Sequence, residues 1–279
     1  MSKVIVTHIN PDLDAMTAVW LLRRFGPEFK DAVVKFVYAG STYEEKPVDS
    51  DNNVVHVDTG WGRFDHHQTG ERTCASQLIL GWLKLEDEAL KRMIEVVTEV
   101  DFEAADLRYP DAGADRYAFL FNERKIISGW QRRYQGQSDK HLEWGMVVLD
   151  GVYENLKAKI AAQGVIDNEG VAFETRWGKG LGAVTNVFGF MPLAQTQGFA
   201  VVVTKDPKKG HVRIHGLNQE GKEDIDLTST AEKLKAKDPQ ATWFLHASKK
   251  LLLNGSTVNP NMVPTSLGLN EVVEVLTSA

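Results

Sequence analysis

Residues 3–25, KVIVTHINPDLDAMTAVWLLRRF, indicate the fold of the chain. The first part, KVIVTHI, is a continuous β-branched apolar run, which is typical of a strand in a parallel sheet that is covered on both faces. In AMTAVWLLRRF the apolar residues recur at helical spacing, and this predicted helix ends before Gly26 and Pro27. A strand followed directly by a helix is the first unit of an α/β layer.

The same pattern continues along the first half of the chain. Apolar runs that end in turn residues predict two more strands, AVVKFVYAG (32–40) and NVVHVDTG (53–60). Helical spacing of apolar residues then predicts helices over residues 76–85, 87–100 and 145–164. We therefore expect an α/β fold with a mostly parallel sheet flanked by helices.

The rest of the chain has a different pattern. Residues 170–178 and 199–217 are predicted to form strands, with KDPKKG (205–210) as a hairpin turn, and residues 227–237 are predicted to form a helix. The predicted domain organisation is an α/β domain over residues 1–140, a connecting helix over 141–165 and a smaller α+β domain over 166–279.

The composition limits the class of protein. The chain has 279 residues, of which 43% are hydrophobic and 25% charged, as in a globular protein with a sizeable core. It has no apolar run of the ~20 residues needed to cross a bilayer, and no secretory signal pattern. Its single cysteine, Cys74, excludes an intramolecular disulfide and fits a reducing compartment. We expect a cytoplasmic protein with no membrane partner, and the net charge of −6 argues against a general binder of long nucleic acid.

Polar side chains follow the first predicted strand directly. His8, Asp12 and Asp14 all occur within HINPDLDA. Aspartate and asparagine are common helix N-caps, so Asn10 or Asp12 could cap the helix that follows. Capping accounts for one or two of these residues, but it does not account for three groups that can bind a metal.

More side chains of the same kind follow. Asp58 ends the third predicted strand, and ligands bind at the carboxyl edge of open parallel sheets. Asp65, His66 and His67 come next, and Asp101 closes a predicted helix. Oxygen and imidazole ligands without thiolate suit Mn²⁺, Mg²⁺ or Fe²⁺. Their number exceeds what one ion needs and matches a site in which two ions ~3.5–4 Å apart activate a water molecule.

The motifs HINPDLDA, VHVDTG and DHH, in this order, resemble those of the DHH phosphoesterase superfamily. Residues 212–250 resemble its substrate-binding DHHA1-type domain, although the loop FLHASKK (244–250) lacks the glycines of the GGGH-like loop and matches only its histidine. The HAS triplet, together with THINPDLDA and FDHHQ, is similar to the branch named for melanocyte proliferating genes, whose members are metal-dependent 3′–5′ RNA exonucleases.

The resemblance implies a role for each residue of the motifs. His8 and Asp12 would hold a first divalent cation, and Asp14, His66 and Asp101 a second, with Asp58 bridging the two. His67 would be a donor that faces the substrate, and Asp65 would orient the neighbouring histidines. The cations would be Mn²⁺, or alternatively Mg²⁺.

The second domain offers candidates for binding a phosphate or the terminal group of a substrate. They are cations, imidazoles and a hydroxyl: Arg213, His215, His246, Ser248, Lys249 and Lys250. At least one of the two lysines is expected in a solvated turn, and Arg213 could instead pair with Asp224 or Asp226. Trp130 and Trp243 could stack on a base, but packing is the favoured interpretation.

These observations predict a metal-dependent phosphoesterase or phosphodiesterase that hydrolyses nucleotides or short oligonucleotides with a water activated by two metals. Three alternatives stay open: a 3′–5′ exonuclease on longer RNA or single-stranded DNA, an inorganic pyrophosphatase, and a non-catalytic nucleotide-binding sensor. The exonuclease would need a basic groove, and the pyrophosphatase a pocket crowded with lysine and arginine. The sequence leaves the oligomeric state open.

Overall fold

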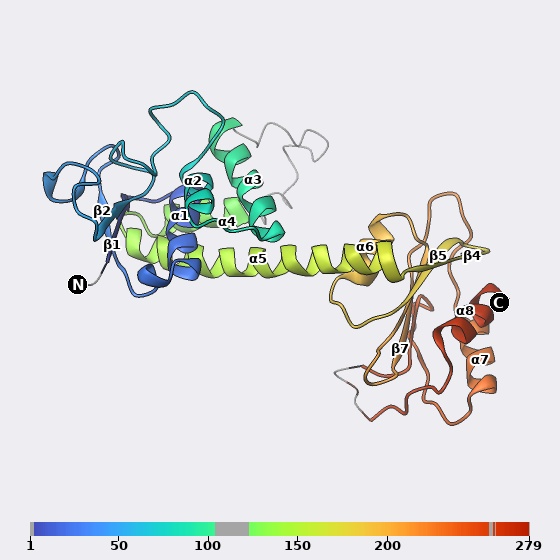
Figure 1. The fold of residues 1–279 in the computed structure, drawn as a ribbon. Coiled ribbons are helices and arrows are strands. Elements are labelled where there is room, and N and C mark those ends of the chain that lie inside the picture. Colours follow the sequence, from blue (N-terminus) through green and yellow to red (C-terminus); the bar gives the residue numbers. More distant parts are fainter. Residues whose placement is uncertain (1–2, 104–122, 257–258, 260, 279) are drawn as a thin grey trace. The chain divides into compact units, whose positions relative to one another are not determined.

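The computed structural model describes residues 3–103, 123–256, 259 and 261–278. The chain divides into two compact units, Met1–Leu156 and Lys157–Ala279, and each is considered by itself (Figure 1). The boundary falls inside one long helix, α5 (Ser138–Glu169), which therefore contributes residues to both units. In the part of the chain that the structure describes, none of the helices has the length and apolar character that crossing a membrane requires.

The first unit contains a three-stranded parallel sheet in the order β2-β1-β3. Its strands are β1 (Val4–His8), β2 (Val33–Val37) and β3 (Val54–His56), so the three strands predicted for this unit are confirmed. Ile5 and Val6 of the central strand are fully buried. Burial of neighbouring residues that point to opposite faces explains why the β1 sequence is apolar throughout rather than alternating.

Strand β3 is shorter than predicted. It ends at His56 rather than at Gly60, because Asp58, Gly60 and Trp61 have φ angles of 54°, 82° and 60°. These angles lie in the left-handed region, through which a strand cannot continue. The chain therefore turns at the carboxyl edge of the sheet.

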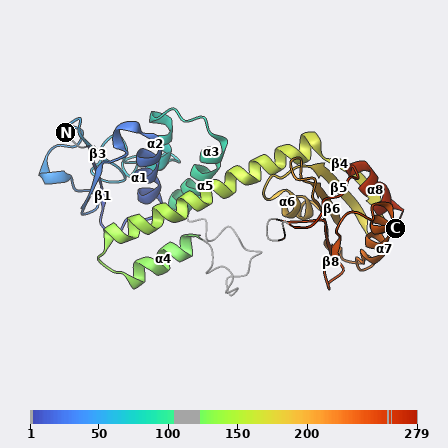
Figure 2. The same cartoon turned by 90° about the horizontal axis from the view of Figure 1, so that it is seen from below.

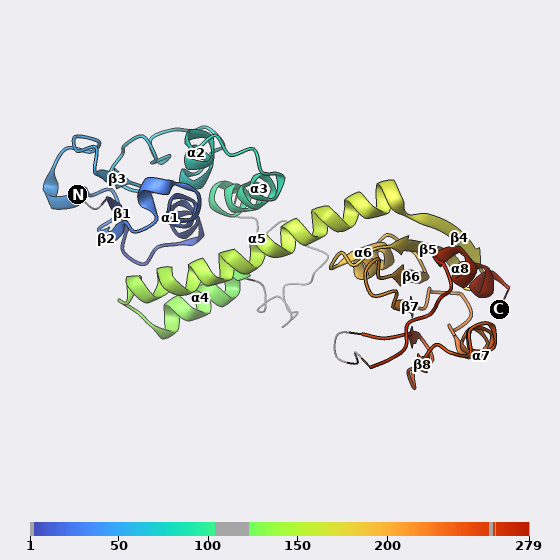
Figure 3. The ribbon, with the colours of Figure 1, turned by 60° about the horizontal axis from the view of Figure 1, so that its bottom comes forward.

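The predicted helices over residues 15–25, 76–85 and 87–100 are present, with small shifts at their ends, as α1 (Leu13–Phe25), α2 (Ala75–Trp82) and α3 (Glu88–Glu103). Helix α1 packs against the central strand β1 of this sheet, and α2 and α3 lie beside α1 (Figure 3). Short 3₁₀ turns cover Pro27–Phe29 and Tyr43–Glu45. Helix α1 packs against both α2 and α3, so the residues that precede α1 lie next to the ends of both helices.

Trp20 is the largest buried side chain of the first unit, with 1% of its surface exposed. Its ring makes edge-to-face contacts with Phe25 and Tyr153, and its Nε1 donates a hydrogen bond of 3.0 Å to Asp150 Oδ1. The Tyr153 hydroxyl in turn donates to Asp87 Oδ2 at 2.7 Å. These contacts fix the first half of α5 against α1 and α3.

One helix and one helix start differ from the sequence prediction. The helix expected over residues 141–165 is part of a longer helix, since α5 begins at Ser138 and runs to Glu169. A separate helix that was not predicted, α4 (Glu123–Arg133), precedes it. Figures 2 and 3 show α4 beside the first half of α5. Leu142 and Leu149 are buried in the core of the unit. Tertiary packing therefore stabilises a helical turn that its polar sequence does not signal.

The second unit contains a six-stranded mixed sheet in the order β4-β5-β6-β7-β9-β8. Its strands are β4 (Val171–Thr175), β5 (Gly178–Val184), β6 (Val201–Lys205), β7 (Val212–Gly216), β8 (Phe244–Leu245) and β9 (Leu251–Leu253). Only the β5–β6 pair is parallel among these described strands. The predicted hairpin at 205–210 is confirmed, since β6 and β7 pair antiparallel across it.

Three helices cover the two faces of this sheet: α6 (Phe190–Thr196), α7 (Thr228–Lys237) and α8 (Leu269–Thr277). Helices α7 and α8 pack on one face, and α6 with the last turns of α5 packs on the other. In the glycine-rich strand β5, a Cβ on Gly180 would overlap the ring of Phe173 on β4. Gly180 therefore allows the two strands to pack closely. The predicted α/β class with a second α+β unit is confirmed.

Candidate metal centre

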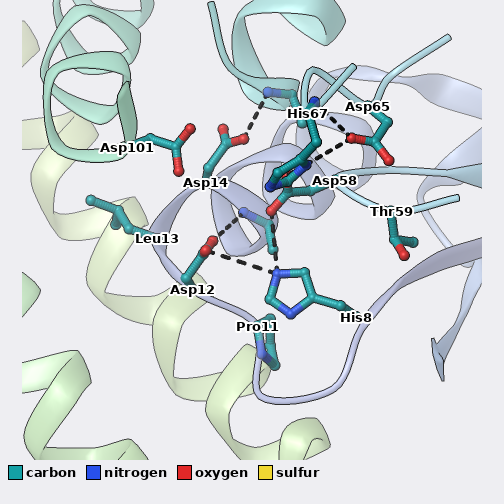
Figure 4. Close-up of polar contacts among 12 residues, drawn as sticks. His8, Pro11, Asp12, Leu13, Asp14, Asp58, Thr59, Asp65, His67 and Asp101 are labelled. Carbon is teal, nitrogen blue, oxygen red and sulfur yellow. Dashed lines mark hydrogen bonds and ion pairs between the residues drawn. The ribbon is translucent and has the colours of Figure 1, made fainter. Parts of the chain in front are cut away.

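The predicted ligands converge at the carboxyl edge of the first sheet (Figure 4). β1 and β3 are adjacent and parallel, so the segments that leave them start side by side. His8 is the last residue of β1, and Asp58 lies just after β3. Four carboxylates and three histidines form three overlapping groups here: His8–Asp12–Asp58, Asp14–His66–Asp101 and Asp58–His66–His67.

Asp58 lies at the centre of these groups and is 3% exposed. Its Oδ2 is 3.2 Å from His8 Nε2, and its Oδ1 is 3.3 Å from His66 Nε2. The backbone of Asp58 is left-handed, at φ 54°, and its N–H donates to the Phe64 carbonyl at 2.9 Å. Aspartate tolerates this conformation better than most residues, and such backbone angles concentrate at functional sites.

The two oxygens of Asp12 face different partners. Its Oδ1 accepts the Ala15 N–H at 3.0 Å and so caps α1, as the capping interpretation expected. Its Oδ2 is 3.9 Å from His8 Nε2. Capping by Oδ1 therefore leaves Oδ2 available to a cation.

The ring of His8 is oriented by its own backbone. Its Nδ1 lies 2.9 Å from the Ile9 carbonyl oxygen, which can only accept, so Nδ1 carries the proton and donates. Nε2 then faces the carboxylates of Asp58 and Asp12. A lone pair directed at two carboxylates requires a proton or a cation between them.

Asp14 is held by the first turn of α2. Its Oδ2 accepts the Ala75 N–H at 2.7 Å, and its Oδ1 accepts the N–H and the hydroxyl of Ser76 at 2.9 Å and 2.5 Å. Asp14 therefore satisfies the free N–H groups of a helix far along the chain. Its Oδ2 is also 3.9 Å from His66 Nε2, which in turn is 3.2 Å from Asp101 Oδ2.

Asp65 contacts His67, an exposed member of the cluster. Its Oδ1 accepts the His67 N–H at 3.1 Å and lies 2.8 Å from His67 Nδ1. Its Oδ2 accepts the backbone N–H of Trp61 at 2.7 Å. Because a carboxylate only accepts, His67 Nδ1 is the protonated nitrogen, and Nε2 is left for other partners.

Two carboxylates of the cluster, Asp14 and Asp101, are hard to ionise without a cation. Burial also disfavours the charged form of Asp58, but its contacts with His66 and His8 outweigh this effect and lower its pKa. Burial, with the charge of Asp58, raises the pKa of Asp14 to about 7, and burial with the charge of Asp12 raises the pKa of Asp101 to about 6. Burial alone lowers the pKa of His8, but its hydrogen bond to Asp58 and the charge of Asp12 raise it to about 9. The close contact with Asp58 also raises the pKa of His66 to about 9.

Three buried atoms in this cluster have no hydrogen-bond partner among the described residues: Asp58 Oδ1, His66 Nε2 and Asp101 Oδ2. The histidine nitrogen is within 3.3 Å of both oxygens. Buried polar atoms are almost always satisfied, so three unsatisfied atoms that face one another call for a further group. Imidazole nitrogen and carboxylate oxygen are the donors that Mn²⁺ and related divalent ions accept, so the residues fit such an ion.

We expect the metal-free protein to lose stability as the pH rises from about 5.5 to about 8.5. Folding raises the pKa of Asp14 and Asp101 from 3.8 to about 7 and 6, and of His8 and His66 from 6.5 to about 9. Groups with a raised pKa stabilise the fold fully below their ordinary pKa, and this contribution disappears as the pH passes the raised value. The metal-free melting temperature should therefore fall by several degrees, about 5 °C or more, across this range.

Mn²⁺ should reverse this trend, because it displaces protons from its ligands and so binds more tightly at higher pH. The check is thermal unfolding with EDTA and with MnCl₂ at several pH values. The difference in melting temperature between the two conditions should widen with pH. A difference that stays constant or shrinks would contradict the assignment of these residues as metal ligands.

The substrate-binding candidates lie in the second unit. Side chains alternate between the two faces of β7, and Val212 and Ile214 are buried under α7 and α8. Arg213 and His215 therefore both point to the other face. His246 precedes the turn into β9, and its Nδ1 accepts the Ser248 N–H at 3.1 Å and lies 2.9 Å from the Ser248 hydroxyl. Because Nδ1 accepts this hydrogen bond, the ring proton of His246 lies on Nε2.

Lys249 differs from the other candidates because it is already paired. Its Nζ is 2.8 Å from Asp226 Oδ2, and this contact, with that of Thr228, lowers the pKa of Asp226 to about 2. The alternative pairing of Arg213 with Asp224 or Asp226 is not found within the described residues: Asp226 holds Lys249, and Asp224 accepts from Asn218. The Lys250 N–H donates to the Ser248 hydroxyl.

Several residues of the first site were not found from the sequence. Trp61 contacts Asp65, and Ser76 contacts Asp14. The segment between His8 and Asp12 is held by Ser138 and Gln131. The Asn10 N–H donates to Ser138 Oγ at 2.9 Å, and Gln131 Nε2 donates to the Pro11 carbonyl at 2.6 Å. Only Trp61 carried a signal, since it lies between VHVDTG and DHH.

The two tryptophans considered for base stacking are packed within the protein. Trp130 stacks on Trp144 with ring centroids 4.2 Å apart and contacts Tyr134 at 4.3 Å. Trp243 belongs to the core of the second unit. Cys74 is fully buried, and burial together with the charge of Asp14 raises its pKa to about 12, so it is not a nucleophile.

The fold and the site together define an α/β protein with a candidate divalent-metal centre at a sheet edge. The model of the family described as ChrB, C-terminal domain, matches residues 5–156, which is more than half of the chain. The chain therefore belongs to this family. The matched range ends at the residue where the first unit ends.

No curated protein matches the chain. Three solved structures resemble it at 12% sequence identity. The first is a pGpG-specific phosphodiesterase, PggH, from Vibrio cholerae; the match covers 90% of this chain and 92% of that one, with a TM-score of 0.32. The second is the DHH domain of a protein described as a member of a family of ribosomal proteins (99% of this chain, 86% of that one, TM-score 0.37), and the third is RecJ with Mg²⁺ from Thermus thermophilus (99% of this chain, 49% of that one, TM-score 0.32). At these TM-scores the likenesses carry no argument about the activity of this chain.

Proposed function

We propose that this protein is a metal-dependent phosphoesterase that hydrolyses phosphate esters of nucleotides or short oligonucleotides. One observation carries the proposal: Asp58 Oδ1, His66 Nε2 and Asp101 Oδ2 are buried, face one another and lack hydrogen-bond partners among the described residues. A cation would satisfy all three atoms. The resemblance of the surrounding motifs to the DHH superfamily supports the choice of phosphate esters as the substrates.

Two cations are proposed, because the two oxygens of Asp58 face different groups. Oδ2 faces His8, with Asp12 nearby, and Oδ1 faces His66, with Asp14 and Asp101 nearby. A carboxylate with this arrangement is suited to bridge two ions. When bound, Mn²⁺ or Mg²⁺ would lower the pKa of a water molecule and neutralise charge on the phosphoryl oxygens.

His67 is proposed to contact the substrate. Its side chain is 53% exposed, and Nδ1–H donates to the buried carboxylate of Asp65. This contact orients the ring and leaves Nε2 to contact a phosphoryl oxygen or the leaving oxygen. Asp65 would therefore act by orienting His67.

In the second unit, Arg213, His215, His246 and Ser248 are proposed to bind an anionic group of the substrate. Arg213 is exposed and, within the described residues, has no carboxylate partner. Lys249 contributes less, because binding a phosphate would break its pair with Asp226. The cytoplasmic location expected from the single cysteine remains a prediction.

The test is hydrolysis by the metal-stripped full chain with and without added Mn²⁺ or Mg²⁺. The substrates are bis(p-nitrophenyl) phosphate, a 5′-phosphorylated dinucleotide, a longer single-stranded RNA and pyrophosphate. Metal-dependent turnover of the dinucleotide above the others supports the proposal. Preference for long RNA would favour an exonuclease, and preference for pyrophosphate an inorganic pyrophosphatase. Metal and nucleotide binding without turnover would favour a sensor.

A further inference from the structure

A large aromatic side chain lies exposed beside the candidate metal centre. Trp61 is 56% exposed, and it follows the central ligand Asp58 by three positions in the sequence. Its ring centroid is 6.4 Å from that of His67, in an edge-on arrangement. Leaving this much of a tryptophan in water forgoes the stabilisation that burial would give. An exposed aromatic ring next to a polar site offers a flat face on which a base can stack.

The ring of Trp61 is held in place although it is exposed. The loop residue Gly40 lies under it, and a Cβ at that position would be 3.1 Å from Trp61 Nε1 and 3.5 Å from two ring carbons. Gly40 also has a left-handed φ of 76°, so the loop both needs glycine and brings its backbone close to the ring. The indole is therefore seated on one side, and its exposed surface faces solvent.

One carboxylate fixes Trp61 and His67 relative to each other. Asp65 is 4% exposed. Its Oδ2 accepts the Trp61 N–H at 2.7 Å, while its Oδ1 holds His67 at 2.8 Å. Trp61 keeps this position with a left-handed φ of 60°, which is unfavourable for a large residue. Strain retained beside a functional group indicates that the position of the ring matters.

We propose that Trp61 is the stacking platform for a nucleobase of the substrate whose phosphate lies at the metal centre. This inference rests on the proposed function and narrows it to nucleoside phosphates, with inorganic pyrophosphate a poor substrate. Every base has a flat π-face, so a single indole gives affinity without strong base selectivity. The platform lies next to His67, the group proposed to contact the phosphate.

The test compares a 5′-phosphorylated dinucleotide with versions of it that lack one base or the other. Wild-type protein with Mn²⁺ should show at least about a tenfold higher kcat/KM for the intact dinucleotide than for one abasic version. Trp61→Ala should remove this difference mainly through KM, and Trp61→Phe should retain part of it. Trp144→Ala is the matched control, because Trp144 is 42% exposed in the same unit but stacks on Trp130.

A second readout does not depend on turnover. Calorimetric binding of adenosine 5′-monophosphate in the presence of Mn²⁺ should be tighter than that of ribose 5-phosphate by about tenfold in wild type and equal to it in Trp61→Ala. Equal binding and hydrolysis with and without a base in the wild type would overturn the platform while leaving the phosphoesterase intact. No hydrolysis or binding of any phosphate would overturn both. Loss of base dependence in Trp144→Ala instead would assign stacking to the other tryptophan and overturn this proposal.

Discussion

Replacing Asp58 with asparagine is expected to reduce metal-dependent phosphodiester hydrolysis by at least about 10³-fold. Each bound cation contributes several kcal/mol of charge stabilisation to such a reaction, and about 4 kcal/mol corresponds to a factor of 10³. Asp58 faces both ligand groups through its two oxygens. The amide keeps the size of the side chain but removes one oxygen and the charge. Hydrolysis of the 5′-phosphorylated dinucleotide and calorimetric Mn²⁺ titration measure the effect.

The matched control is Asp31→Asn, which makes the same chemical change at an exposed position of the same unit. It should leave both activity and the number of bound ions unchanged. The Asp58 variant should keep the far-ultraviolet circular dichroism of the wild type while it binds fewer ions. A variant that stays folded and hydrolyses the dinucleotide at a rate within tenfold of the wild type would sink the assignment of Asp58 as a bridging ligand.

Replacing Trp20 with alanine is expected to lower the free energy of unfolding of the first unit by about 3–5 kcal/mol. The indole is 1% exposed, contacts two aromatic rings and donates a hydrogen bond to Asp150. Its removal leaves a cavity between α1 and α5 and takes away the indole hydrogen bond to Asp150. Urea unfolding followed by circular dichroism measures the loss.

Tyr38→Ala provides the comparison, because Tyr38 is 75% exposed in the same unit. Surface substitutions of this kind change stability by about 0.5 kcal/mol or less. The Trp20 variant should unfold at a lower urea concentration with a separate first transition, since the two units have separate cores. Equal unfolding midpoints for the two variants would show that Trp20 is not a main element of the core.

Local sequence was sufficient to predict the elements whose pattern is unambiguous. The continuous apolar run of β1 and the helical spacing after Asp12 gave the strand, the helix and the turn between them. Parallel strands align their carboxyl ends, so the sequence also predicted that His8 and Asp58 meet at one edge. Their ligand roles, and those of the other members of the cluster, remain predictions.

Only the tertiary structure decided how these side chains are supported. Asp14 accepts from Ala75 and Ser76, which are about sixty positions away in the chain, and such long-range contacts have no local signal. The start of α5 is polar in sequence and is helical because Leu142 and Leu149 are buried against α1 and its neighbours. Lys249 pairs with Asp226 rather than remaining a free cation, because a left-handed turn (φ 60°) brings it there.

The sequence by itself determined the fold class, the strand that carries His8 and the chemical kind of side chain at the sheet edge. These features depend on residue type and on spacings of two to four residues, which act through local backbone geometry. The tertiary structure alone decided which oxygen of Asp12 caps a helix, that Asp65 holds both Trp61 and His67, and which buried atoms are left without partners. Those features depend on directions and distances between segments that are far apart in the chain, and no local pattern encodes them.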